Sequence, residues 1–185
     1  MKRYITILIS MLSFIFAANA QNDETLYFYG VDFSQVQVIA ANETEQEFAK
    51  AFSGINFLLV SEREKYDFSK VMNQPVSAHP DHMIEQSLSN DYSAMKVYRY
   101  ENSDIDVAKM VESYNFKQKS GQGLILIAVY LDKPAGSACY EAVLFDINTR
   151  EILRQNRLTS LAGGFGLRNY WARTVYNLTL RESLF

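Results

Sequence analysis

Cysteine, histidine and proline are scarce in this sequence. Cys139 is the only cysteine, so no disulfide bond can form within the chain. It lies inside an apolar run, which predicts a small buried side chain rather than a reactive thiol. His79 and His82 are the only histidines, and Pro80 between them argues against a helix that presents both rings on one face. We therefore expect two exposed loop histidines and no metal site.

Signatures of catalytic chemistry are missing as well. The sequence contains no G-x-S-x-G nucleophile elbow, no H-E-x-x-H zinc motif and no P-loop. Carboxylate pairs such as Asp104 and Asp106 stand where helix capping already explains them. The sequence therefore predicts no cofactor and favours a protein that is not an enzyme.

The chain also lacks an excess of positive charge. Its 18 lysine and arginine residues face 21 acidic residues, which gives a net charge of −3. Lys2 and Arg3 belong to an expected signal peptide, and without them 16 cations and 21 acids give −5. A mildly acidic protein has no general electrostatic attraction to nucleic acid or to an anionic membrane. Nucleic acid is therefore excluded as an expected partner.

The sequence has no apolar run long enough to span a membrane comfortably. Residues 1–20 instead predict a secretory signal peptide, with a charged start at Lys2 and Arg3, an apolar middle and an A-x-A cleavage site. We expect cleavage after Ala20, and no cysteine lies near it that would carry a lipid anchor. The expected product is periplasmic or secreted, with no transmembrane segment.

Residues 21–185 are expected to form a single globular domain. The length suits one sizeable core, and there is no repeat, low-complexity tract or linker. The predicted fold class is α/β (α+β): a mixed sheet of about five strands, with an antiparallel meander in its carboxyl-terminal part and helices on both faces. Residues 61–93 show no clear pattern, and we expect loops there with one strand or short helix near Met83–Leu88.

Three predicted strands in a row organise the fold. The first, Leu124–Leu131, is continuously apolar, which is typical of a strand covered on both faces. Turn residues separate it from Ala138–Ile147, and a second turn leads to Glu151–Leu158. The charged and polar residues of the third strand favour a place at the edge of the sheet. Two shorter strands are expected at Val36–Ile39 and Met95–Tyr100.

Three helices are predicted from capping residues and apolar periodicity. Asn42 or Thr44 caps the first, a capping box at residues 103–106 opens the second, and the third spans Arg168–Leu184. The predicted apolar stripes comprise Phe48, Ala51, Phe52, Ile55, Leu58 and Leu59 in the first helix, Val107, Ala108, Val111 and Tyr114 in the second, and Trp171, Val175 and Leu178 in the third.

The glycine-rich corner between the third strand and the last helix is the first candidate binding site. Gly163, Gly164 and Gly166 permit a sharp turn at the start of a helix, where backbone N–H groups can face an anion. Arg168 is placed to add a bidentate contact, and Asn169 adds a further polar group. The spacing matches neither the dinucleotide fingerprint nor a P-loop, so the pattern indicates an anion site without naming a ligand.

A structural explanation of the same corner stays open. Glycines also allow a tight connection that carries no ligand. In that interpretation the corner serves to place Phe165 and Trp171 in the core.

Aromatic clusters are the second candidate. Tyr27 near the mature start, the group Tyr98, Arg99 and Tyr100, and Tyr170 are predicted interface residues, because tyrosine and arginine are enriched where proteins bind each other. An envelope protein or a glycan is the partner that such a surface suggests. The alternative is that most of these rings fill the core.

The ending G-G-F-G-L-R-N-Y-W at residues 163–171 and the F-D-I-N-T turn at residues 145–149 resemble a group of uncharacterised, signal-bearing envelope proteins of Bacteroides-type bacteria. The resemblance implies a Gram-negative envelope and a periplasmic or secreted product. A weaker likeness, in the strand that starts at Glu151, is to the amino-terminal domain of the TolB translocation protein. That likeness implies a binding module near the outer membrane, and fold likeness alone does not carry function.

Together these observations favour an exported, non-enzymatic binding or assembly module of the bacterial cell envelope. The alternative is a small protein or enzyme that binds an anionic ligand at the corner from Gly163 to Arg168. A third hypothesis is a homo-oligomer joined through the edge of the strand Glu151–Leu158.

Overall fold

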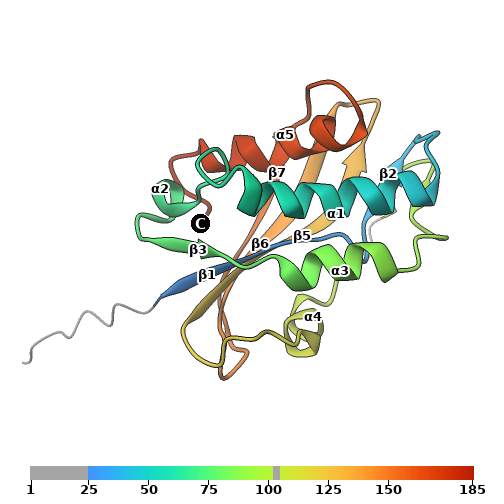
Figure 1. Cartoon of the computed structure of the whole chain (residues 1–185). Coiled ribbons are helices and arrows are strands. Elements are labelled where there is room, and N and C mark those ends of the chain that lie inside the picture. Colours follow the sequence, from blue (N-terminus) through green and yellow to red (C-terminus); the bar gives the residue numbers. More distant parts are fainter. Residues whose placement is uncertain (1–24, 102–104) are drawn as a thin grey trace, which may run out of the picture.

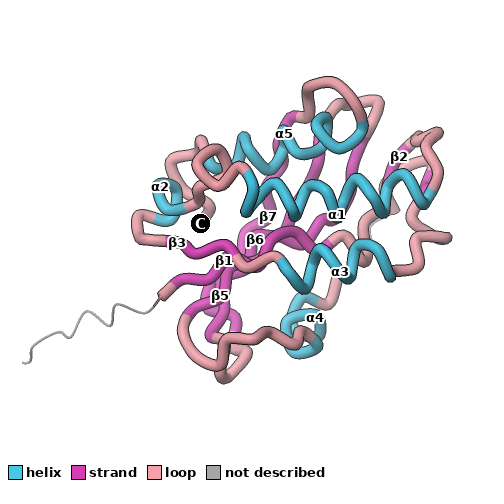
Figure 2. Tube along the Cα trace, viewed as in Figure 1, coloured by secondary structure: helices cyan, strands magenta, loops and turns pink. Residues whose placement is uncertain are grey.

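The computed structural model describes residues 25–101 and 105–185, which form a mixed α/β fold with seven strands and five helices (Figure 1, Figure 2). In chain order the elements are β1 (Leu26–Asp32), β2 (Gln37–Ile39), α1 (Glu45–Ser61), α2 (Ser69–Met72), β3 (Val76–Ala78), α3 (Asp81–Ser89), β4 (Lys96–Val97), α4 (Val107–Ser113), β5 (Gln122–Asp132), β6 (Ser137–Asp146), β7 (Ile152–Leu161) and α5 (Leu167–Thr179). The predicted signal peptide lies outside the described residues. In the described part of the chain, no helix has the length and apolar character needed to cross a membrane.

β5 is the centre of a mostly parallel sheet. β6 pairs antiparallel with β5 from Gln122 to Asp132, and β7 pairs antiparallel with β6. β1 and β2 therefore share the other edge of β5, where both run parallel to it: β1 pairs with residues 122–127 and β2 with residues 130–132. β3 and β4 pair in parallel with β1 and β2 on the outside.

The prediction of about five strands with an antiparallel meander holds only in part. β6 does run antiparallel to both β5 and β7, and among the described strands β7 pairs with β6 alone. However, β5 also anchors the parallel strands, so the meander is not a separate part of the sheet. The predicted strand Met95–Tyr100 shortens to Lys96–Val97, and β3 has three residues, which is too short for a recognisable period in the sequence.

Both faces of β5 are covered, as its continuous apolar run predicted. Leu124, Leu126 and Ala128 belong to a core cluster with side chains of α1 and α5. Ile125 and Ile127 belong to a second cluster with side chains of α4. Figure 1 shows α1 and α5 on one side of the sheet and α4 on the other. The prediction of helices on both faces is therefore confirmed.

α1 begins where its capping residues predicted. The Thr44 hydroxyl accepts a hydrogen bond from the N–H of Glu47, and the Glu47 carboxylate accepts one from the N–H of Thr44, which completes a capping box. Further along, Gly54 lies against α5: a Cβ at this position would lie 2.8 Å from Cδ of Arg168. Glycine therefore allows the Arg168 side chain to cross α1 closely.

A buried amide takes the place of a neighbouring strand beside β1. β3 pairs with β1 only as far as Phe28. Beyond that point the Asn56 side chain of α1 accepts a hydrogen bond from the Val31 N–H at 2.8 Å and donates one to the Val31 carbonyl at 2.9 Å. Gly30 makes room for the amide, because a Cβ there would lie 2.4 Å from Oδ1 of Asn56. Hydrogen bonds as well as apolar contacts thus fix α1 to the sheet.

The predicted start of the second helix is wrong. Asp106 is itself the N-cap of α4, and its carboxylate accepts a hydrogen bond from the Lys109 N–H at 3.0 Å. Residues 102–104 lie outside the described part of the chain. Ala108, predicted to be buried, is exposed, because the buried stripe of α4 starts at Val107 and continues three and four residues later.

The predicted end of the last helix is also wrong. α5 ends at Thr179, and the chain turns at Leu180. Leu184 still reaches the core, fully buried, from the segment after the helix, which explains why its spacing continued the apolar stripe. Cys139 is buried in β6 as predicted, and burial raises the pKa of its thiol, which keeps the sulfur protonated and unreactive.

Candidate functional site

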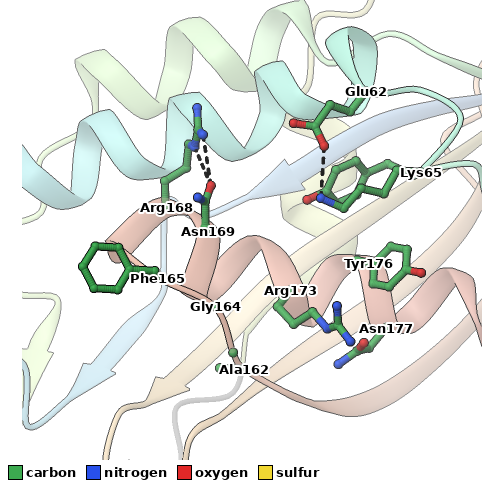
Figure 3. Close-up of a pocket in the computed structure, with 12 residues that line it drawn as sticks. Glu62, Lys65, Ala162, Gly164, Phe165, Arg168, Asn169, Arg173, Tyr176 and Asn177 are labelled. Carbon is green, nitrogen blue, oxygen red and sulfur yellow. Dashed lines mark hydrogen bonds and ion pairs between the residues drawn. The ribbon is translucent and has the colours of Figure 1, made fainter.

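A groove of about 590 Å³ opens between the carboxyl-terminal end of α1 and α5, and we call it the α1–α5 groove. Its lining comes from the turn after α1, from the glycine-rich corner and from α5 (Figure 3). The lining residues are Glu62, Lys65, Tyr66, Ala162, Gly163, Gly164, Phe165, Arg168, Asn169, Arg173, Tyr176 and Asn177.

Three cations and one carboxylate line this groove. Lys65, Arg168 and Arg173 supply the positive charge, and Glu62 is the one acid in the lining set. Glu62 is already occupied, because its carboxylate accepts a hydrogen bond from Nζ of Lys65 at 3.0 Å. That hydrogen bond raises the pKa of Lys65. The pair cancels the charge of Lys65, so Arg168 and Arg173 leave the groove with a net positive charge inside a protein that is acidic overall.

The Arg168 guanidinium is exposed to solvent and is held by hydrogen bonds to its neighbour Asn169. Its Nε and Nη2 donate to Oδ1 of Asn169 at 3.1 and 3.0 Å, and the stem of the side chain lies against Gly54. Arg168 and Asn169 are both exposed. Because an exposed amide is a weaker acceptor than a carboxylate or phosphate, an anionic ligand would compete for this guanidinium.

The other two cations lie near aromatic rings. Nζ of Lys65 lies 5.1 Å from the ring centroid of Tyr66 and 5.9 Å from that of Tyr176. The guanidinium of Arg173 lies 5.0 Å from the Tyr176 ring. Such contacts favour a cation near the ring face without neutralising its charge. Tyr66 and Tyr176 therefore help to hold Lys65 and Arg173 at the groove.

The glycine-rich corner has the backbone that its composition predicted. Gly164 and Gly166 take φ values of 105° and 80°, which residues with a side chain rarely adopt. The N–H of Gly163 donates to the Tyr170 carbonyl at 3.1 Å and closes the turn onto the first turn of α5. Gly166 is the N-cap of α5, and because glycine has no side chain it supplies no capping hydrogen bond to the first N–H groups of the helix.

The structural explanation of the corner is wrong for one of its two rings. Trp171 is fully buried, as predicted, whereas Phe165 is 94% exposed. Phe165 stands between the two glycines with positive φ, in the turn itself and before the first residue of α5. The corner thus anchors α5 through Trp171 and presents Phe165 to solvent.

Four of the five predicted ligand residues line the groove, namely Gly163, Gly164, Arg168 and Asn169. Gly166 lines a neighbouring cavity of about 390 Å³ together with Trp171 and the ion pair between Glu43 and Lys133. The sequence did not indicate Lys65, Tyr66, Arg173 or Tyr176. Residue spacing carries no signal for them, because the first two join the site only when α1 packs beside α5.

The five predicted interface residues lie in three separate parts of the fold. Tyr27 is half-buried at the start of β1, edge-on to a histidine ring 5.4 Å away. Tyr98 and Arg99 are exposed after β4, and Tyr100 packs on a tyrosine near the end of β5. Tyr170 of α5 is half-buried and packs against the first core cluster, on the other face of the sheet from Tyr27, which packs against the second. The structure does not bring these side chains together into one surface.

The prediction of two exposed loop histidines holds only in part: His79 lies in the loop between β3 and α3, whereas His82 lies in α3. Both histidines are half-buried, and both line a cavity of about 490 Å³ between the start of α3 and the segment before β5. His79 follows β3 and hydrogen-bonds through its ring to Ser77 and Gln118, and His82 lies in α3, so the two rings do not share one helix, as Pro80 predicted. Pro80 is tolerated because it precedes the first helical residue. Among the described residues, no group of three histidine, cysteine or acidic side chains is placed to hold a metal ion.

Compared with protein-family models, with curated proteins and with solved structures, the chain matches none of them.

Proposed function

We propose that this chain is an exported, non-enzymatic binding module, and that it binds an anion-bearing ligand in the α1–α5 groove. The observation that supports the proposal is the excess of positive charge in one groove, where Arg168 and Arg173 stand beside a Lys65 that is paired with Glu62, the single carboxylate of the lining. Export is the part of the proposal that rests on the signal peptide expected at residues 1–20 and on the resemblance to envelope proteins.

The chemistry of the groove suits carboxylate or phosphate groups. Each arginine presents a planar fork of N–H donors that matches two oxygens of such a group, and Lys65 adds a point charge. Hydrogen bonds to charged groups contribute about 1.5–3 kcal/mol each, and exposed sites stand at the lower end of that range. With the cost of association deducted, we expect a dissociation constant of roughly 10 μM to 1 mM.

Anion binding is expected to raise the melting temperature. At a citrate or inorganic phosphate concentration of about ten times Kd, the stabilisation is about 1.4 kcal/mol, which corresponds to roughly 3–6 °C for a chain of this size. Arg168→Ala should remove most of this shift without unfolding the protein, since Arg168 is exposed. Differential scanning fluorimetry at constant ionic strength measures both effects.

A matched control is Arg154→Ala, which removes an exposed arginine of β7 that does not line the groove. This variant should keep the full shift. The proposal fails if sodium chloride at equal ionic strength gives the same shift as citrate. It also fails if Arg168→Ala and Arg154→Ala behave alike.

A further inference from the structure

Phe165 is the most unusual side chain at the rim of the groove. It is 94% exposed, and Figure 3 shows its ring turned away from the other labelled side chains of the groove. Single exposed apolar residues are common on protein surfaces and need no explanation by themselves. Here, however, Phe165 stands at the rim of a cationic groove, in a sharp turn built by Gly164 and Gly166, which both take positive φ.

The surroundings of Phe165 carry the opposite charge from the protein as a whole. The chain has a net charge of −3, yet the groove that Phe165 lines contains Lys65, Arg168 and Arg173 against the single, paired carboxylate of Glu62. The overall negative charge excludes a general attraction to anionic surfaces. At physiological salt, charges more than about 8–10 Å apart interact only weakly. The nearby cations therefore contribute more to the electrostatic potential at this rim than the net charge of the protein does.

We propose that the anion taken by the groove is the headgroup of a lipid in an anionic membrane surface, and that Phe165 inserts beside it into the interfacial layer. This inference rests on the proposed function and adds the source of the ligand to it. A membrane presents a layer of negative charge above an apolar layer, and cations behind a protruding aromatic ring match that order. A small soluble anion would satisfy the cations and leave Phe165 without a contact.

The expected interaction is weak, reversible and sensitive to salt, because one aromatic side chain and a few cations cannot anchor a protein permanently. Phe165 and the cations should contribute separately: the ring acts only at a bilayer, whereas the cations act on soluble anions as well. Replacing Phe165 therefore separates the two proposals. Because its side chain is almost fully exposed, Phe165→Ser should fold normally.

The test is co-sedimentation with vesicles, using the processed chain purified after export so that residues 1–20 do not contribute. Vesicles of phosphatidylglycerol and phosphatidylcholine should bind the protein, and vesicles of phosphatidylcholine alone should bind at least tenfold less. Phe165→Ser should lower binding to the anionic vesicles at least fivefold, a far larger loss than it causes in the melting shift with citrate. Arg168→Ala should lower both.

Leu88→Ser is the matched control, because Leu88 is an apolar side chain on α3 that is 59% exposed and lies outside the groove. It should bind anionic vesicles like the unchanged protein. A citrate shift without vesicle binding, or vesicle binding that Phe165→Ser leaves intact, would overturn the inference while the proposed function stands. Binding to a soluble acidic peptide that needs Phe165, with no vesicle binding, would overturn it in favour of a protein partner. If citrate does not raise the melting temperature of the unchanged protein, both the inference and the proposed function are overturned.

Discussion

Asn56→Ala is expected to lower the free energy of unfolding by about 3–5 kcal/mol. The Asn56 side chain is fully buried, and it holds both the N–H and the carbonyl of Val31 at 2.8 and 2.9 Å. Alanine leaves these two buried backbone groups without partners, and each unpaired group costs about 1–3 kcal/mol. Urea denaturation followed by circular dichroism measures the change in unfolding free energy.

An exposed asparagine provides the control for this variant. Asn115→Ala removes the same amide from the segment before β5, where it is exposed, and should change stability by about 0.5 kcal/mol or less. If Asn56→Ala costs less than about 1 kcal/mol, the amide does not replace the missing strand contact. The positions of α1 and β1 would then depend on apolar packing alone.

Gly123→Ala is expected to destabilise the protein by about 2–3 kcal/mol. Gly123 lies in β5 directly opposite Phe145 of β6, whose ring covers it: a Cβ would lie 2.3–2.7 Å from three ring carbons. The ring is fully buried and stacks on Tyr29 and Phe116 with centroids 6.1 and 5.8 Å away, so it has little room to move. Thermal and urea denaturation both report this loss.

A double-mutant cycle shows whether the clash is with that ring. Gly123→Ala added to Phe145→Leu should cost at least 1 kcal/mol less than in the unchanged protein, because the smaller side chain leaves room for the methyl group. Gly163→Ala is the matched control, since its Cβ would find Arg173 Cγ at an ordinary 3.6 Å. Equal costs of Gly123→Ala in both backgrounds would mean that the strain lies in the backbone.

The local features of this protein could be predicted from its sequence. Leu124–Leu131 is an unbroken apolar run, and β5 is indeed covered on both faces. Thr44 and Glu47 form the cap of α1 because the capping box needs only residues within one helical turn. The sharp corner after β7 follows from glycines that accept positive φ. In each case the cause lies within a few residues of the effect.

Other features were decided only when distant segments met. β1 and β2 share one edge of β5 because β6 occupies the other, and no spacing within the chain indicates this. Trp171 reaches the core and Phe165 does not, whereas hydrophobicity alone placed both rings inside, which is wrong for Phe165.

Some residues of the candidate site could likewise be predicted from the sequence, whereas others became apparent only in the tertiary structure. The amino-acid sequence by itself determined the glycine corner with Arg168 and Asn169, because the signal is local and chemical. Only the tertiary structure added Lys65 from the turn after α1 and joined it with Arg173 in one groove. Helix periodicity shows which face of a helix is buried, but the face of the neighbouring helix that it meets depends on the sheet beneath both.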